Sequence, residues 1–151
     1  MAAGPWTFYQ TAKKHLMDGT IDLDSDTFQM ALYTSASNAS LSATSVSCVG
    51  SITNEVLEAN GYMSSGKTIA GVTWGQGASA SEVRFDSTIT VWTAGPGDIQ
   101  NVKYAVVWKT AASAGGRKVL MYTQLSISPF NVTAGNTLTI TPSANGYFEL
   151  N

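Results

Sequence analysis

The clearest pattern of apolar and polar positions lies between residues 21 and 34. An acidic segment, Ile21-Asp-Leu-Asp-Ser-Asp26, leads directly into Thr27-Phe-Gln-Met-Ala-Leu-Tyr-Thr34. In that second segment Phe28, Met30 and Leu32 share one face, and the residues between them share the other. A period of two is typical of a half-buried antiparallel strand. The pattern therefore predicts a core strand with a polar lead-in.

Further strands are predicted at short intervals in the second half of the chain. The most apolar run, Val102-Lys-Tyr-Ala-Val-Val-Trp108, indicates a central strand buried on both faces. A tip at 111–116 and a returning strand at 117–125 predict an antiparallel pair with it. The other expected strands are 68–74, 82–86, 89–93, 130–132, 137–141 and 147–150, with turns at 75–77, 94–97 and Asn145-Gly146. About eight strands at this spacing predict an antiparallel β-sandwich or a barrel-like core.

One amphipathic helix is predicted near the N-terminus, over residues 5–17. Pro5 suits a first helical turn, and Asp18-Gly19 supplies a stop signal. Tyr9, Ala12 and Leu16 fall on one apolar stripe. The helix is expected either to cover the core of its own domain or to dock onto another subunit.

The segment between the first strand and residue 67 has no clear period. Residues 35–51 are rich in Ser, Ala and Asn, which predicts a long surface loop. The next segment, Ile52-Thr-Asn-Glu-Val-Leu-Glu-Ala-Asn-Gly61, is compatible with one or two helical turns closed by Asn60-Gly61.

Composition agrees with a mainly β protein. The chain has 151 residues, of which 12% are charged and 44% hydrophobic. We therefore expect a single β-rich domain over residues 1–151, with the helix at 5–17 and the β core at 21–151.

Charge and cysteine content exclude several classes of function. The net charge of −2 offers no basic surface for nucleic acid. Cys48 is the only cysteine, so neither an intrachain disulfide nor a cysteine-cluster zinc site is expected. No secretory signal or membrane-spanning run is seen, which predicts a soluble protein made in the cytoplasm.

No catalytic or cofactor-binding set is recognisable, and no enzyme activity or cofactor is expected. Asp22, Asp24 and Asp26 have the spacing of a calcium loop, but Thr27 and Tyr33 stand where an EF-hand needs Gly and an acidic ligand. We interpret the three carboxylates as a turn-forming lead-in, with calcium as the alternative. The only histidine, His15, is predicted to be a surface residue, without an oriented nucleophile beside it.

Four tryptophans allow two interpretations. Trp6, Trp74, Trp92 and Trp108 would serve as sugar-binding platforms if their rings were exposed. Three of them lie within or at the end of apolar strands, which favours packing in the core or at a sheet edge.

Several motifs together resemble a family of small virion proteins from tailed bacteriophages. The resemblance begins with Trp6-Thr-Phe-Tyr9 and with Asp18-Gly-Thr-Ile-Asp-Leu-Asp-Ser-Asp-Thr-Phe-Gln-Met-Ala-Leu-Tyr-Thr-Ser35. It continues through 53–56, 61–62, 72–74, 83–86, 104–107, 132–135 and the closing Gly146-Tyr-Phe-Glu-Leu150. The chain departs most from the pattern at 35–51 and 111–116.

The resemblance implies a structural role in the virion and carries no catalytic residues. It implies a capsid decoration or cement protein that binds the major capsid protein and copies of itself on the expanded head. The alternatives are a tail or neck component and a receptor-facing carbohydrate-binding module. Under the decoration hypothesis we expect Trp6, Phe8 and Tyr9, with the 35–51 loop, to form the contact surface.

Overall fold

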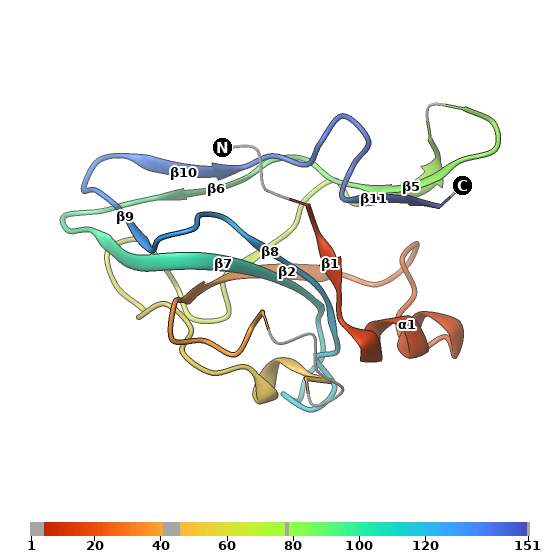
Figure 1. The fold of residues 1–151 in the computed structure, drawn as a ribbon, viewed down its shortest axis with the longest axis horizontal. Coiled ribbons are helices and arrows are strands. Elements are labelled where there is room, and N and C mark those ends of the chain that lie inside the picture. The colour runs from red at the N-terminus through yellow and green to blue at the C-terminus, as the bar shows by residue number, and fades with distance from the viewer. Residues whose placement is uncertain (1–4, 41–45, 78, 151) are drawn as a thin grey trace.

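Two β layers pack face to face in a computed structural model that describes residues 5–40, 46–77 and 79–150. The larger sheet has the strand order β1-β8-β7-β2-β3, and β9 also pairs with β7. The opposite layer contains a two-stranded sheet, β10-β6, and a three-stranded sheet, β11-β5-β4 (Figure 1). All of the strand pairings are antiparallel, so the predicted mainly β, sandwich-like fold is confirmed.

The described residues contain eleven strands and one α-helix. Those of the larger sheet are β1 (Thr7–Phe8), β2 (Phe28–Thr34), β3 (Lys67–Thr68), β7 (Ile99–Lys109), β8 (Val119–Gln124) and β9 (Phe130–Val132). Those of the opposite layer are β4 (Thr73–Gln76), β5 (Val83–Asp86), β6 (Thr90–Thr93), β10 (Thr137–Ile140) and β11 (Phe148–Leu150). The helix α1 is Gln10–Met17, and a 3₁₀ turn covers Val49–Ser51.

The predicted central strand is the middle of the larger sheet. β7 pairs with β2 on one side and with β8 on the other. Tyr104 through Trp108 are all buried, as expected for a strand covered on both faces. The predicted β2 strand is confirmed as well, with Phe28, Met30 and Leu32 fully buried.

The predicted helix is too long at its N-terminal end. Thr7 and Phe8 form β1, which pairs with Tyr122 and Met121 of β8. Tyr9 keeps an extended backbone and donates its N–H to the Leu120 carbonyl oxygen, so the helix begins only at Gln10. The reason is that the run Trp6-Thr-Phe-Tyr9 favours extended structure, and the free edge of β8 supplies its hydrogen-bond partners.

The expected helical turns at 52–61 are absent. Glu55 forms a β-bridge with Tyr33, and Val56 donates its N–H to Leu32. Glu55 is half-buried, and its Oε1 accepts from the Tyr62 hydroxyl at 2.7 Å and from the Ser65 N–H at 2.6 Å. These bonds hold the segment along β2, so the sheet edge overrides the local helical pattern.

The strand predicted at 68–74 is two strands in different sheets. β3 pairs with β2, whereas β4 pairs with β5, and Gly71 between them has a φ of +61°. The chain crosses here from one layer to the other. The expected turn at Gly75-Gln-Gly77 is also wrong, because β4 continues through Gln76.

The hairpin predicted at Asn145-Gly146 does not join β10 to β11. The turn itself forms, since Ser143 and Gly146 bridge each other, but β10 pairs with β6 and β11 pairs with β5. β5 and β6 follow one another in the chain, and β10 and β11 run back along them. Local turn residues cannot reveal such long-range pairing.

Gly66 is the position where the fold most clearly requires glycine. Its φ is +70°, and a Cβ there would overlap the Met30 carbonyl oxygen of β2. Gly135 has a similar φ of +79°, but nothing lies within 4 Å of the corresponding Cβ position.

We expect Gly135→Ala to cost about 1 kcal/mol of stability from backbone strain alone, and Gly66→Ala about 2–4 kcal/mol because overpacking adds to it. Urea unfolding of both variants tests this, and equal losses would contradict it.

Glu55 is expected to make stability depend on pH. Burial raises the pKa of its carboxyl above the ordinary 4.5, although the Tyr62 and Ser65 hydrogen bonds oppose this. Because the pKa of Glu55 is raised in the folded state, its contribution to stability is greatest when the carboxyl is protonated. That contribution is lost as the pH rises from the ordinary pKa through the folded-state pKa. Glu55→Gln keeps an oxygen acceptor without a charge, so its stability relative to wild type should increase between about pH 4 and about pH 7.

Glu55→Ala is the matched control, since it removes the carboxylate that accepts from the Tyr62 hydroxyl and the Ser65 N–H. We expect a loss of about 1–3 kcal/mol at neutral pH. Urea unfolding at both pH values measures these effects. A Glu55→Gln variant that follows the wild-type pH profile would rule out Glu55 as the source of the dependence.

Candidate docking site

An apolar groove of about 610 Å³ opens between α1 and the β11-β5-β4 sheet. Aromatic and aliphatic side chains form most of its lining. The sheet supplies Trp74, Phe148 and Leu150; the N-terminal segment and helix supply Phe8, Leu16 and Met17; and the acidic loop supplies Ile21 and Leu23. Lys13 and Asp22 are its charged lining residues.

The sheet wall of the groove is set by strand register. Trp74 and Phe148 both pair with Phe85, one from each side, so the three rings lie in one row on the same face. The Phe85 ring is fully buried and stacks on Phe148 at 5.5 Å between centroids. Phe8 of β1 meets Phe148 edge-on at 4.6 Å. This row continues the sandwich core into the groove.

The outer part of the groove exposes its apolar side chains. Leu150 pairs with Val83 one row beyond the aromatic row and is 57% exposed, while Val83 is 36% exposed. On the helix side, Met17 is 92% exposed at the end of α1. Apolar side chains clustered around an open groove indicate a contact surface for another molecule.

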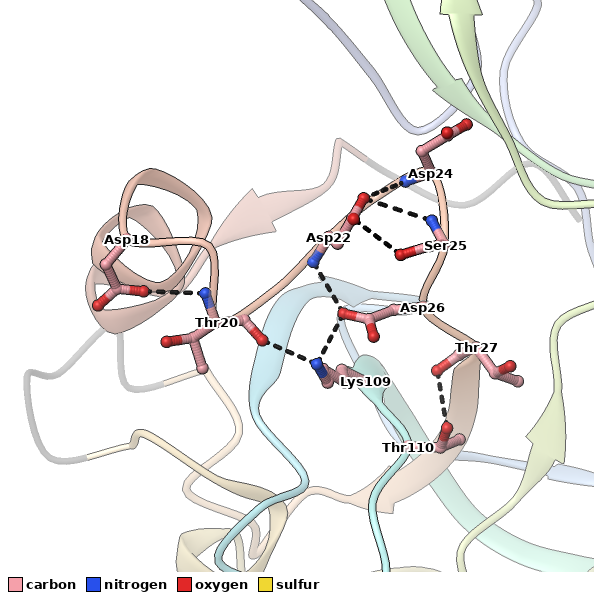
Figure 2. Close-up of polar contacts among 9 residues, drawn as sticks. All are labelled: Asp18, Thr20, Asp22, Asp24, Ser25, Asp26, Thr27, Lys109 and Thr110. Atoms are coloured by element: carbon pink, nitrogen blue, oxygen red, sulfur yellow. Dashed lines mark hydrogen bonds and ion pairs between the residues drawn. The ribbon is translucent and has the colours of Figure 1, made fainter.

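The acidic loop beside the groove is organised by its own carboxylates (Figure 2). Asp22 accepts from the Asp24 N–H at 2.9 Å and from the Ser25 hydroxyl at 2.7 Å. Asp26 accepts from the Asp22 N–H at 2.7 Å. It also pairs with Lys109 at 2.9 Å. The Lys109 ammonium donates in addition to the Thr20 carbonyl oxygen at 2.8 Å, which ties the loop to the end of β7.

These hydrogen bonds also affect the pKa of Asp22. The Ser25 hydroxyl and the Asp24 N–H lower the pKa of Asp22, because both stabilise the ionised carboxylate. Asp24 points away from Asp22 and Asp26 in Figure 2. Among residues 5–40, 46–77 and 79–150, no group of three or more His, Cys, Asp or Glu side chains is arranged to hold a metal.

The three predicted contact residues have different environments. Tyr9 is fully buried, and its hydroxyl donates to the Ala39 carbonyl oxygen at 2.7 Å, so it is not available to a partner. Phe8 is half-buried and lines the groove. Trp6 is half-buried and packs edge-on against Tyr147 at 5.0 Å.

The 35–51 loop is less exposed than predicted where the structure describes it. Ala39 and Val46 are buried, and the Val46 carbonyl oxygen accepts from the Thr11 hydroxyl at 2.7 Å. Cys48 forms a backbone β-bridge with Lys118, immediately before β8. These bonds hold the described parts of the loop against α1 and β8. Residues 41–45 of this prediction lie outside the described residues.

The remaining candidate residues are mostly structural. Trp92 and Trp108 are fully buried, so neither ring is a sugar platform, while Trp74 is half-buried at the groove.

His15 is less exposed than predicted, because both of its ring nitrogens are buried without a hydrogen-bond partner among the described residues. Burial, followed by the nearby Lys118 charge, lowers the pKa of His15. No helix in the described part of the chain is long and apolar enough to span a membrane.

The groove itself was not predicted from the sequence. Its sheet wall combines residues from two segments, 74 and 148–150, that are brought together only by their pairing with β5. The exposed apolar residues of each segment, taken alone, resemble ordinary strand positions.

The acidic loop offers a test with a matched control. Asp22→Ala removes the acceptor for the Asp24 N–H and the Ser25 hydroxyl, so we expect a lower melting temperature. Asp24→Ala changes a carboxylate that points away from this network and should leave the melting temperature unchanged.

The pH dependence of this effect follows from the lowered pKa. A lowered folded-state pKa stabilises the fold above the ordinary aspartate value, 3.8, and this contribution is lost as the pH falls through the folded value. The difference between wild type and Asp22→Ala should therefore shrink in acid. Thermal melts at neutral and acidic pH check both effects, and identical behaviour of the two variants would contradict the assigned role.

Function is inferred from the chain's own residues. Comparisons with models of protein families, with curated proteins and with solved structures found no match.

Proposed function

We propose that this protein is a structural component of a tailed-bacteriophage virion, acting as a capsid decoration or cement protein on the expanded head. The observation that carries the proposal is the exposed apolar groove at one end of a β-sandwich. A groove of this kind suits a protein that acts by contact with its neighbours. The resemblance of residues 6–9, 18–35 and 146–150 to virion proteins supplies the setting.

Under this proposal the protein stabilises the shell by adding binding free energy between capsid subunits that are under mechanical load. Packaged genome presses outward on the junctions between capsid subunits, and a domain that binds two subunits at once resists their separation. When the concentration of free protein is about 100 times its dissociation constant, binding stabilises the decorated shell by about 2.7 kcal/mol per site. Many sites per particle multiply this effect. The partners under this proposal are the major capsid protein and copies of the chain itself.

Trp6 is the residue of the predicted contact set that remains suited to the shell contact. Tyr9 is buried, and Phe8 is half-buried in the groove lining, where its ring meets Phe148 edge-on. Trp6 immediately precedes β1 and is half-buried. Large aromatic residues of this kind dominate the energetics of many protein interfaces.

The decisive experiment adds the purified protein to expanded heads that lack decoration. We expect saturable binding and a higher temperature of thermal rupture. Failure to bind would remove the decoration function and leave the tail, neck and receptor roles. Cryo-electron microscopy of the particle would then locate the protein, and a glycan array would detect a lectin.

A matched pair of variants tests the contact residue. Trp6→Ala should weaken head binding by about tenfold or more, because an interface aromatic is lost. Ile89→Ala removes an apolar side chain that is 54% exposed outside the groove and should bind as wild type does. Thermal melts show whether Trp6→Ala keeps its fold. If a folded Trp6→Ala variant bound heads normally, Trp6 would lie outside the interface.

A further inference from the structure

His15 of α1 has two polar ring atoms that the fold shields from solvent. Neither Nδ1 nor Nε2 has a hydrogen-bond partner among the described residues. A neutral imidazole carries one N–H donor and one acceptor, and a protonated ring carries two donors. Burial of such groups without partners costs free energy, and burial of a charged ring costs more. The folded position of His15 therefore accommodates the neutral ring and offers no acceptor to a second N–H.

The charges around the ring do not compensate for a proton on it. Burial lowers the pKa of His15 most, and the Lys118 ammonium, immediately before β8, lowers it further. The Asp18 carboxylate raises it, whereas the Lys14 ammonium of the helix itself lowers it. Asp18 already accepts from the Lys14 ammonium and from the Thr20 N–H. A protonated His15 would therefore be buried near two cations, and the one carboxylate nearby already has other partners.

α1 is held to the rest of the domain by few buried side chains. Ala12 is the one buried residue of its eight. The Thr11 hydroxyl donates to the Val46 carbonyl oxygen at 2.7 Å. Within the described residues 5–40, Tyr9 at the N-cap position makes no capping bond through its side chain. Elements with little buried surface open locally while the rest of a protein stays folded.

We infer that α1 is a pH-sensitive element, which leaves its place beside β8 when His15 takes up a proton in mildly acidic solution. In the released segment the imidazolium is hydrated and lies farther from Lys118. The helix supplies Lys13, Leu16 and Met17 to the groove, so its release removes one wall of the groove. The inference goes beyond the decoration function and does not depend on binding to heads.

Proton uptake by His15 sets the direction of the pH effect. A group whose pKa is lowered in the folded state binds its proton more tightly once it is released. The contribution of His15 to holding α1 in place is therefore complete above the ordinary histidine pKa, 6.5. It is lost as the pH falls from that value through the folded-state pKa. Between about pH 7.5 and about pH 5.5, the opening equilibrium of α1 should rise by about three- to tenfold.

Amide hydrogen exchange of the full chain measures this opening, after correction for the intrinsic effect of pH on exchange. We expect the amides of residues 10–17 to be less protected than those of β7, and to exchange independently of low urea concentrations, because local opening exposes little surface. Acid should lower their protection by about three- to tenfold. His15→Leu cannot take up a proton and leaves no polar ring atom unpaired, so its helix should be equally protected at both pH values.

A second pair of variants tests the charge beside the ring. Lys118→Gln brings the folded-state pKa of His15 closer to its ordinary value, so the acid response of α1 should shrink. Lys103→Gln removes the same charge from another part of β7. Lys118 bonds to Lys109 through the backbone, and the six residues from 103 to 109 span roughly 20 Å of strand. Lys103→Gln should therefore respond to acid as wild type does.

Several results would overturn the inference. Protection of residues 10–17 that does not change with pH would do so, as would an acid response that persists in His15→Leu. Exchange of α1 only together with β7, with the same dependence on urea, would show that the helix opens only when the whole domain unfolds. An undiminished response in Lys118→Gln would also contradict it. Thermal melts at neutral pH show that each variant is folded before its exchange is compared.

Discussion

The packing of the Phe85 ring is the interaction on which the rest of the structure depends. The ring is fully buried and meets Phe28 of the opposite sheet edge-on at 5.2 Å between centroids. It also contacts Tyr147 and Phe148 of the segment that returns along β5. One side chain therefore joins the two layers and holds the C-terminal strand in register. Because cross-strand neighbours share a face, the same ring aligns Trp74 and Phe148 beside it.

The groove follows from this alignment. The Trp74, Phe85 and Phe148 row is buried at its centre, but in the next row on the same face Leu150 lines the groove and is 57% exposed. The helix supplies Lys13, Leu16 and Met17 to the lining. An uncovered continuation of a core is a natural docking surface, since it is already rigid and desolvates readily.

Polar side chains in the loops have a different task, which is to hold irregular segments in place without regular pairing. Asp22 and Asp26 accept hydrogen bonds from the backbone of their own loop, and Lys109 ties that loop to β7. Glu55 does the same for the segment beside β2 through Tyr62 and Ser65. Buried or half-buried backbone groups require partners, and these side chains provide them where no strand is available.

Local pattern was sufficient to predict most of the individual strands and the antiparallel β7–β8 pair, but not the partners that lie farther away in the chain. The alternation in 28–34 and the apolar run at 102–108 determine β2 and the centre of β7, because a period of two and burial on both faces are properties of single segments. The acidic lead-in was likewise predicted as a turn. Only the tertiary structure decided that 7–8 would extend β8, that 68–74 would divide between two sheets, and that residues 74 and 148–150 would meet across β5. Those outcomes depend on hydrogen-bond partners far away in the chain, and no local propensity contains that information.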